Sequence, residues 1–176
     1  MSRPHHAGDR AGDQASALTR RIALSRLRLV SSQIHATCVA LPEGGVLLRG
    51  ESGAGKSDLA LRLIDGGARL VADDRTDIVR EGDRLIARAP TTIAGLIEAR
   101  GVGILRLPAE RLALQASVVL IVDLVDAASV ERLPETTREE LLGVSLRRVS
   151  LAAFEASTPA KIRLALIASG SASSPP

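Results

Sequence analysis

The sequence predicts an α/β domain with a mixed central sheet, and three features of the chain support this fold class. An apolar run at 46–48 leads through a glycine-rich stretch into an amphipathic segment at 58–64, which is the order strand, loop, helix. Further apolar runs at 69–72 and 118–122 predict more strands, and the second is typical of a buried one. A chain of 176 residues with 45% hydrophobic content is sufficient for one domain with a substantial core.

The sheet is predicted to begin at residues 33–40, where alternating and β-branched side chains indicate a strand. Residues 42–45 then form a turn, and residues 46–49 return as the strand that leads into the glycine-rich stretch. Pairing of these two strands would bring His35 near that stretch. A single histidine in a strand is more often structural than catalytic, so the residues alone favour a structural role for His35.

The glycine-rich stretch matches the phosphate-binding P-loop pattern Gly-x-x-x-x-Gly-Lys-Ser, between the strand and the helix that this motif requires. Small residues let backbone N–H groups surround phosphate oxygens where the helix dipole is positive. Lys56 is one of only two lysines in an arginine-rich chain, which indicates that a compact ammonium is needed to reach the β- and γ-phosphates. The Ser57 hydroxyl is suited to bind Mg²⁺. The predicted phosphate site consists of Gly50, Glu51, Ser52, Gly53, Ala54, Gly55, Lys56 and Ser57.

Two adjacent carboxylates follow the next predicted strand. The P-loop helix ends at the glycines of residues 65–67, and the strand at 69–72 runs directly into Asp73 and Asp74. In an open α/β sheet, catalytic groups lie at the carboxyl ends of strands beside such a loop. One carboxylate is expected to hold Mg²⁺ or its water, and the other to accept a proton from a substrate hydroxyl. The alternative is an acidic turn without a catalytic role.

The middle of the chain predicts a hairpin and a second glycine-rich segment. Strands at 77–80 and 84–88 flank a turn that contains Gly82. A segment after Pro90 carries Glu98 and Arg100 ahead of a glycine cluster.

The last third of the chain predicts two more elements after the buried strand. Residues 133–142 resemble a loop that passes into a short charged element, and residues 145–150 are predicted as a strand. Thr158 as N-cap and Pro159 at the first helical position then predict a final helix.

Composition excludes several function classes. Phe154 is the only aromatic residue, which argues against binding single-stranded nucleic acid, and no apolar stretch is long enough to cross a membrane. A single cysteine, Cys38, excludes an intrachain disulfide and is compatible with the cytoplasm. Residues 1–30 are expected to be a poorly ordered arm and residues 169–176 a tail, which leaves residues 31–168 as the domain.

Four segments occur in the order and spacing of the HPr kinase/phosphorylase family, whose catalytic domain the chain resembles from about residue 30 to 168. They are Ile34-His35-Ala36, the P-loop, Leu70-Val71-Ala72-Asp73-Asp74 and residues 96–104, of which the last two are far more specific than the P-loop alone. The resemblance implies a phosphoenolpyruvate-carboxykinase-like P-loop fold and a hexamer. It also implies an enzyme that uses ATP and Mg²⁺ to phosphorylate a serine of HPr, the phosphocarrier protein of the sugar phosphotransferase system. In the reverse reaction, inorganic phosphate removes that group and pyrophosphate is released.

The resemblance further implies roles for single residues. His35 corresponds to the family's active-site histidine, which reverses the structural interpretation of this residue, and Lys56 corresponds to the P-loop lysine. Asp74 corresponds to the carboxylate that acts as base in phosphorylation and as acid in the reverse reaction, with Asp73 supporting it.

Further correspondences concern the metal and the substrate. Ser57 and Glu98 correspond to the magnesium ligands, and Arg100 lies in the family signature, where it helps to position substrate. The family's late active-site arginine has no clean counterpart. Lys161 is favoured over Arg163 for that role because lysine is so scarce in this chain.

Two departures from the family keep alternatives open. Only a short arm precedes His35 where longer members carry an N-terminal domain, and the glycine-rich insert that follows the family signature is missing after Ile104. These differences leave open whether the reverse activity is retained. The alternatives to an HPr kinase are a P-loop kinase of a small hydroxylated metabolite and a regulatory module that senses ATP without transferring phosphate.

Overall fold

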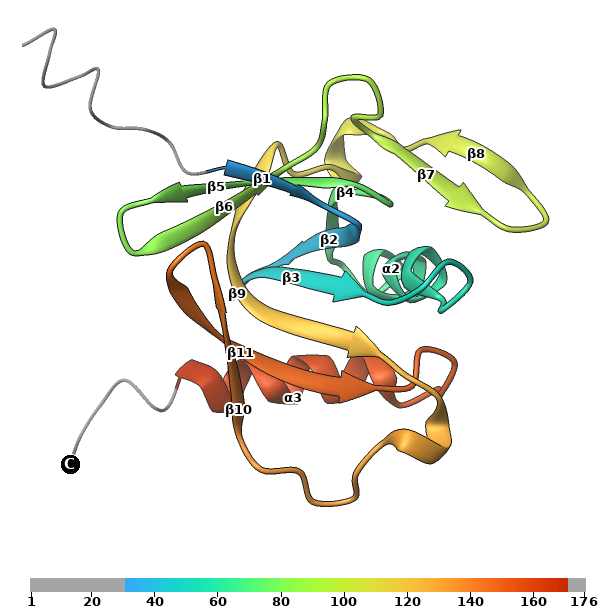
Figure 1. Cartoon of the computed structure of the whole chain (residues 1–176). Helices are drawn as coiled ribbons and strands as arrows, with labels where there is room; N and C mark the ends of the chain where they lie inside the picture. The colour runs from blue at the N-terminus through green and yellow to red at the C-terminus, as the bar shows by residue number, and fades with distance from the viewer. Residues whose placement is uncertain (1–30, 171–176) are drawn as a thin grey trace, which may run out of the picture.

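A curled mixed β-sheet with helices against one face makes up residues 31–170, the part of the chain that the computed structural model describes (Figure 1). Along its main path the strands follow the order β1 (Ser31–Ile34), β5 (Thr76–Glu81), β6 (Arg84–Arg88), β9 (Gln115–Leu124), β3 (Gly44–Arg49), β2 (Ala36–Leu41) and β4 (Arg69–Ala72). A branch adds β11 (Val144–Leu151) beside β9, and β10 (Thr137–Leu141) beside β11. The predicted α/β fold with a mixed sheet is confirmed.

The other elements lie around this sheet. Within residues 31–170 the helices are α2 (Lys56–Asp65) and α3 (Thr158–Gly170), and two 3₁₀ turns are η1 (Ala109–Arg111) and η2 (Ala127–Ser129). β7 (Leu96–Ala99) and β8 (Gly103–Arg106) form a separate hairpin that projects from the body of the fold (Figure 1). Within residues 31–170, no helix has the length and apolar character needed to span a membrane. The predicted arm and residues 171–176 lie outside the described part of the chain.

Strand direction brings the loops of interest to one edge of the sheet. β2 runs antiparallel to both β3 and β4, while β3 and β11 run parallel to β9. The strands β3, β4, β9 and β11 therefore all end at the same edge. The P-loop follows β3 there, and Asp73 and Asp74 follow β4. Such an edge is where α/β folds bind ligands.

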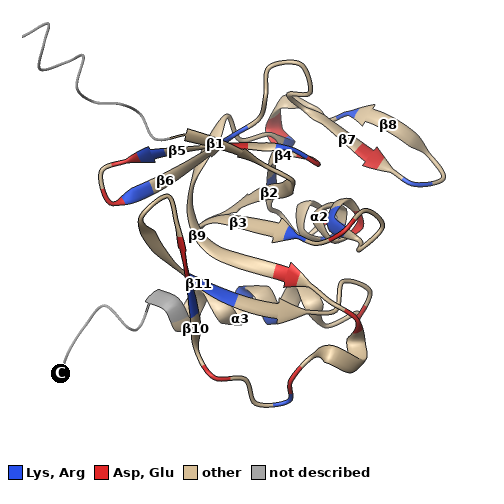
Figure 2. Cartoon of the chain, in the orientation of Figure 1, with Lys and Arg blue, Asp and Glu red and all other residues tan. Residues whose placement is uncertain are grey.

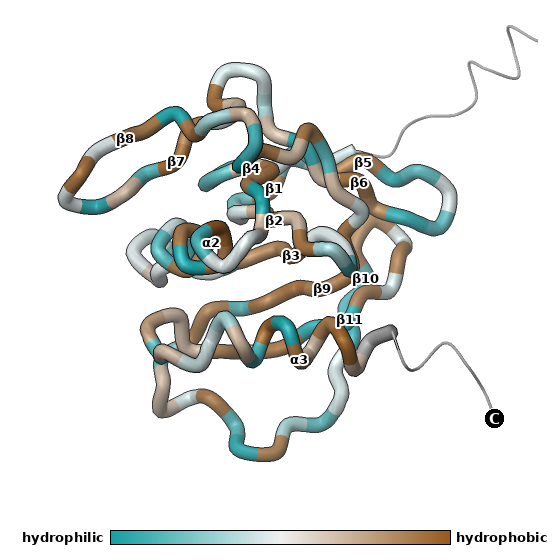
Figure 3. The backbone as a smooth tube through the Cα atoms, turned by 180° about the vertical axis from the view of Figure 1, so that it is seen from behind, coloured by the Kyte–Doolittle hydropathy of each residue, from teal (hydrophilic) through white to brown (hydrophobic). Residues whose placement is uncertain are grey.

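The core is divided between the two faces of the sheet. On one face, Leu63 of α2 and Ile162 of α3 belong to the buried cluster that includes Leu48 of β3. On the other face, Leu47 packs in a cluster with Leu85 of the β5–β6 hairpin. The side chains of successive residues of β3 thus point to opposite faces of the sheet, as the pleat of a strand requires. Figure 3 shows the hydrophobic colour concentrated along β3 and β9, in the middle of the fold.

The predicted strand at 33–40 is wrong in one respect, because the chain bends at His35 and forms two strands with different partners. β1 pairs with β5, whereas β2 pairs with β3 and β4. β2 is buried throughout, and β1 alternates between exposed and partly buried residues. The bend leaves His35 exposed at the edge where β3 and β4 end.

Candidate active site

The P-loop has its lysine folded back onto its own backbone. The side chain of Lys56 is only 6% exposed, and its Nζ donates hydrogen bonds to the carbonyls of Gly50 at 2.8 Å and Glu51 at 2.9 Å. Gly55 has a φ of +92°, and a Cβ at this position would lie 2.7 Å from the Cβ of Ala153. Only glycine is compatible with both constraints. The sequence pattern therefore specifies a tight loop with a cation across its first turn.

Asp73 lies at the centre of a buried hydrogen-bond cluster. Its carboxylate accepts bonds from the hydroxyls of Ser57 at 2.9 Å and Thr37 at 2.8 Å, and from the backbone N–H of Glu98 at 3.0 Å. Asp73 is 7% exposed, and no cation within residues 31–170 forms a salt bridge with it. All these donors are neutral, so the carboxylate is held in place while its charge is left uncompensated.

This donor set fits Mg²⁺. In the described residues no group of three His, Cys, Asp or Glu side chains is arranged as a metal site. Mg²⁺ in nucleotide enzymes uses one or two carboxylates, a P-loop hydroxyl and the phosphates of the substrate, so a dedicated protein cage is not required. The hydrogen-bonded Ser57 and Asp73 supply the hydroxyl and the carboxylate.

Asp74 is held differently from its neighbour. Its side chain is 65% exposed, and its Oδ1 lies 2.7 Å from Nε2 of His35. The backbone of Asp74 has a φ of +63°, and the N–H of Arg75 donates to the carbonyl of Asp73 at 2.7 Å, as in a γ-turn. This conformation is unfavourable for most residues with a side chain, although aspartate adopts it more readily than most, and strained residues of this kind cluster at functional sites. The strained turn separates a buried carboxylate from an exposed one beside a histidine.

The remaining predicted site residues have fewer or no side-chain contacts with Asp73 and Asp74. The side chain of Glu98 is exposed, and the contact of Glu98 with the cluster is made by its backbone N–H. Arg100 is exposed at the turn between β7 and β8. Nζ of Lys161 forms an ion pair with Glu155 in the loop after β11, on the opposite side of β3 from β4 and Asp74. The structure thus joins His35 to Asp74 and Ser57 to Asp73, and it places Lys161 with neither pair.

Sequence reasoning missed an ion-pair network next to the P-loop. Arg49, the residue before the P-loop, donates to both carboxylate oxygens of Asp123 at 2.8 and 3.1 Å, and to both oxygens of Glu139 at 2.6 and 2.7 Å. Arg148 also pairs with Asp123. In Figure 2 these charges lie at the ends of β3 and β9 and along β10 and β11. No local sequence signal indicates the network, because its members come from four strands.

The network shifts the pKa values of Asp123, Glu139 and Arg49. Burial raises the pKa of Asp123, but the hydrogen bonds from Arg49 and Arg148 outweigh this effect and hold the pKa below its ordinary value. The hydrogen bond from Arg49 lowers the pKa of Glu139, and the same bond raises the pKa of the Arg49 guanidinium. Arg49, Asp123 and Glu139 are therefore charged at neutral pH.

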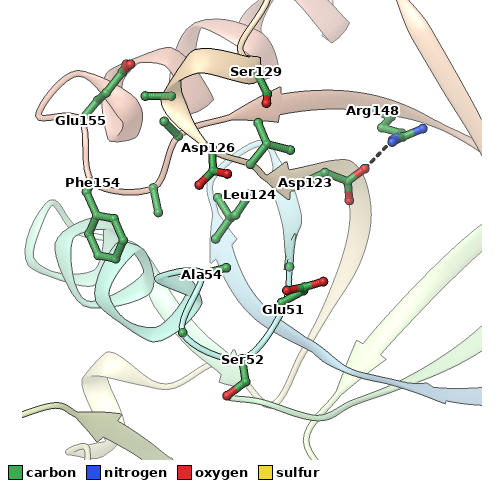
Figure 4. A pocket seen from close by; sticks show the side chains of 16 residues that line it. Glu51, Ser52, Ala54, Asp123, Leu124, Asp126, Ser129, Arg148, Phe154 and Glu155 are labelled. Atoms are coloured by element: carbon green, nitrogen blue, oxygen red, sulfur yellow. Dashed lines mark hydrogen bonds and ion pairs between the residues drawn. The ribbon is translucent and has the colours of Figure 1, made fainter.

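A cavity of about 920 Å³ opens beside the first half of the P-loop (Figure 4). Its wall is formed by residues 50–54, residues 123–127 at the end of β9, and residues 152–155 after β11, together with Ser129 and Arg148. This volume is in the range of small-molecule sites. The cavity therefore provides ligand space on the side of β3 that faces away from Asp74.

Comparison with known proteins identifies relatives that share this domain. HPr kinase/phosphorylase of Chromobacterium violaceum is 37% identical over 142 residues, which are 74% of this chain and 45% of that protein. HPr kinase/phosphorylase of Clostridium acetobutylicum is 45% identical over 78 residues, which are 44% of this chain and 26% of that protein. The chain thus spans less than half the length of these curated relatives.

Structure and family comparisons agree with this result. The solved structure of the Hpr(Ser) kinase/phosphatase from Coxiella burnetii matches with a TM-score of 0.69 and 28% sequence identity, over 80% of this chain and 96% of that one. Residues 28–169 match the sequence profile of the family described as HPr Serine kinase C-terminal domain. Since this match covers well over half of the sequence, the chain belongs to the HPr serine kinase C-terminal domain family.

Proposed function

We propose that this protein transfers the γ-phosphate of ATP to a serine of an HPr-type phosphocarrier protein. The observation that carries the proposal is the arrangement at one edge of the sheet, where the P-loop, the Ser57–Asp73 pair and the His35–Asp74 pair meet. The names of the curated relatives support HPr as the phosphate acceptor.

In the proposed forward reaction, each group has a separate task. The P-loop amides and Lys56 bind the phosphates, and Ser57 and Asp73 would hold the Mg²⁺ that screens their negative charge. Asp74 accepts the proton of the serine hydroxyl while the serine oxygen forms its bond to phosphorus and ADP leaves. Oδ1 of Asp74 is already bonded to His35, so Oδ2 is the oxygen available to the substrate. We assign Glu98 to the metal and Arg100 to substrate positioning, and we retain Lys161 as the late basic residue.

The reverse reaction uses the same groups, but Asp74 begins protonated and acts as the acid. Inorganic phosphate attacks the phosphorus of phosphoserine, the P–O bond to serine breaks, and protonated Asp74 returns the proton to the serine oxygen. The products are serine and pyrophosphate. This phosphorolysis is part of the proposal, as the relatives' name, kinase/phosphorylase, suggests.

Assembly and location complete the proposal. We infer a homo-oligomer, a hexamer by resemblance to the family, that acts in the cytoplasm. Exposed apolar side chains on the β7–β8 hairpin, with Val102 and Ile104 each 72% exposed, support contacts with another molecule.

The test is a phosphotransfer assay with labelled ATP, Mg²⁺ and HPr from the same organism, followed by a chase with inorganic phosphate. Label on an HPr serine that the chase releases as pyrophosphate supports both directions of the proposal. Label that stays on HPr supports the kinase alone. Tight ATP binding without label on HPr contradicts the proposal and favours a sensor or a small-molecule kinase.

Asp74→Asn is the first variant to measure. It should lower the transfer rate about 10³-fold, because it removes the proton acceptor while it keeps the side-chain shape, and ATP binding should change little. Asp83→Asn is the matched control, since the Asp83 side chain is 95% exposed in the β5–β6 turn. Transfer by Asp74→Asn at the parent rate would exclude Asp74 as the base.

A further inference from the structure

The P-loop has chemically different surroundings on its two sides. On the β2–β4 side lie Ser57 with Asp73 and, beyond them, the His35–Asp74 pair. On the β9–β11 side lies the cavity, which contacts only the first half of the loop, residues 50–54. If the γ-phosphate is to reach Asp74, the nucleoside at the other end of the triphosphate has to lie away from that side. The cavity provides space for it.

Phe154 forms part of the cavity wall and is unusual in two respects. It is the only aromatic residue of the chain, and its side chain is nevertheless 71% exposed. A Cβ at Gly55 would lie only 2.9 Å from the phenyl ring, so the ring lies directly over the P-loop backbone. An exposed aromatic ring at the mouth of a phosphate-binding loop is a suitable surface for a planar base.

The backbone on both sides of Phe154 is anchored. The guanidinium of Arg62, on the P-loop helix, donates to the carbonyl of Glu155 at 3.2 Å and to the carbonyl of Ala153. Arg62 is itself oriented by an ion pair with Asp58, one helical turn earlier. The ring is therefore presented from a fixed segment, which reduces the entropy lost when a ligand binds.

The polar groups of the cavity match the donors of a nucleoside. Asp126 and Ser129 lie in the wall, and within residues 31–170 the structure shows no hydrogen bond from another group to the Asp126 carboxylate. Ribose hydroxyls and base amino groups are donors that a carboxylate accepts. In Figure 4, Asp126 lies between Phe154 and the pair formed by Asp123 and Arg148.

We propose that the nucleobase of the bound nucleotide stacks on the ring of Phe154, with its ribose toward Asp126. This inference rests on the proposed nucleotide-dependent function and adds to it the residue that recognises the base. Phe154 then contributes to affinity for nucleotides but not to affinity for the phosphate chain alone.

The test compares a phosphate chain that carries a nucleoside with one that lacks it. Binding of ADP and of inorganic tripolyphosphate, each with Mg²⁺, is measured by calorimetry, so that no turnover is involved. Phe154→Ala should weaken ADP binding about tenfold and leave tripolyphosphate binding within about twofold, because one base–aromatic stack is lost. Phe154→Leu fills similar space without an aromatic face and should also weaken ADP. Leu114→Ala is the control, since Leu114 is 94% exposed next to the opposite end of β9.

Phe154→Trp provides an independent readout. The chain has no Trp and no Tyr, so the new indole is the only strong fluorophore. Its emission should change on addition of ADP but not of tripolyphosphate, and ADP affinity should be retained. Leu114→Trp should give no signal with either probe.

Several results would overturn the inference. Equal weakening of both probes by Phe154→Ala would show that the ring only supports the P-loop at Gly55. Unchanged ADP binding with weaker HPr binding would make Phe154 a partner contact. Unchanged ADP binding by Phe154→Ala, together with normal transfer to HPr, would overturn this inference and leave the proposed function intact. A parent protein that binds neither probe would overturn the proposed function as well.

Discussion

Two carboxylates at the same edge of the sheet, Asp73 after β4 and Asp123 at the end of β9, are held by opposite kinds of partner. Asp73 accepts hydrogen bonds from two hydroxyls and a backbone amide, none of which carries charge. Asp123 is paired with the guanidinium groups of Arg49 and Arg148. Both side chains accept several hydrogen bonds, but of the two only Asp123 has cationic partners among residues 31–170 that neutralise its charge.

From this difference we infer a separate role for each cluster. A buried carboxylate held by neutral donors is costly until a cation arrives, so the Asp73 cluster is suited to bind a metal that comes with the substrate. A carboxylate paired with arginines needs nothing more, so the Arg49 network is suited to hold β3, β9, β10 and β11 together beside the P-loop. Separate measurements of activity and stability test this distinction.

Between the two clusters, the largest expected effect is the loss of activity in Asp73→Asn. The amide keeps the size of the side chain but loses the charge, so transfer to HPr should fall about 10²- to 10³-fold. The free energy of unfolding should change little, because removal of an uncompensated buried charge offsets the loss of one of the two hydrogen-bond-accepting oxygens. Rate measurements at several Mg²⁺ concentrations and urea unfolding give the two quantities.

Glu139→Gln is the counterpart in the other network. Glu139 accepts two bonds from Arg49 and does not line the cavity, so this variant should lose stability and keep its transfer rate. If Glu139→Gln were the inactive variant and Asp73→Asn the unstable one, the distinction between the two clusters would be wrong.

Removal of Arg49, which both carboxylates of the network share, should give the next largest effect, a loss of stability. In Arg49→Met, Asp123 and Glu139 lose a bidentate partner at sites where their side chains are only 17% and 29% exposed. We expect a loss of about 2 kcal/mol in the free energy of unfolding at pH 7. The control is Arg84→Met, whose ion pair is exposed and 3.9 Å long. Equal stability of Arg49→Met and the parent would mean that the network contributes nothing.

The same network should make the free energy of unfolding depend on pH in the acid range. The pKa values of Asp123 and Glu139 are lowered in the folded protein, so as the pH falls the unfolded chain takes up their protons first. Their contribution is therefore fully present above the ordinary carboxyl pKa of about 4, and it is lost as the pH falls through the lower folded values. In Arg49→Met this acid-dependent part should become smaller. Denaturant midpoints between about pH 3 and pH 6 provide the measurement, and parallel curves for the two proteins would contradict the assignment.

The comparison also separates what the sequence revealed from what it did not. The strand–loop–helix order around the P-loop, the position of Asp73 and Asp74 after β4 and the glycine end of α2 agree with the prediction, because each depends on neighbouring residues. Arg49 lies 74 residues from Asp123 and 90 from Glu139, so no local pattern could pair them. The bend at His35 was missed for the same reason, since it arises where the chain changes from β5 to β3 and β4 as its partner strands.

The smallest expected effect concerns Arg148, the outer member of the network. It contacts Asp123 through Nε, and its side chain is 44% exposed. Asp123 keeps both of its bonds from Arg49 when Arg148 is removed, so no carboxylate is left without a cation. Arg148→Met should therefore cost about 0.5 kcal/mol of unfolding free energy, the usual value for an exposed ion pair. A double-mutant cycle of Arg49→Met with Arg148→Met measures whether the two arginines act together. If Arg148→Met cost as much as Arg49→Met, the network would depend on the Arg148 charge rather than on the bidentate contacts of Arg49.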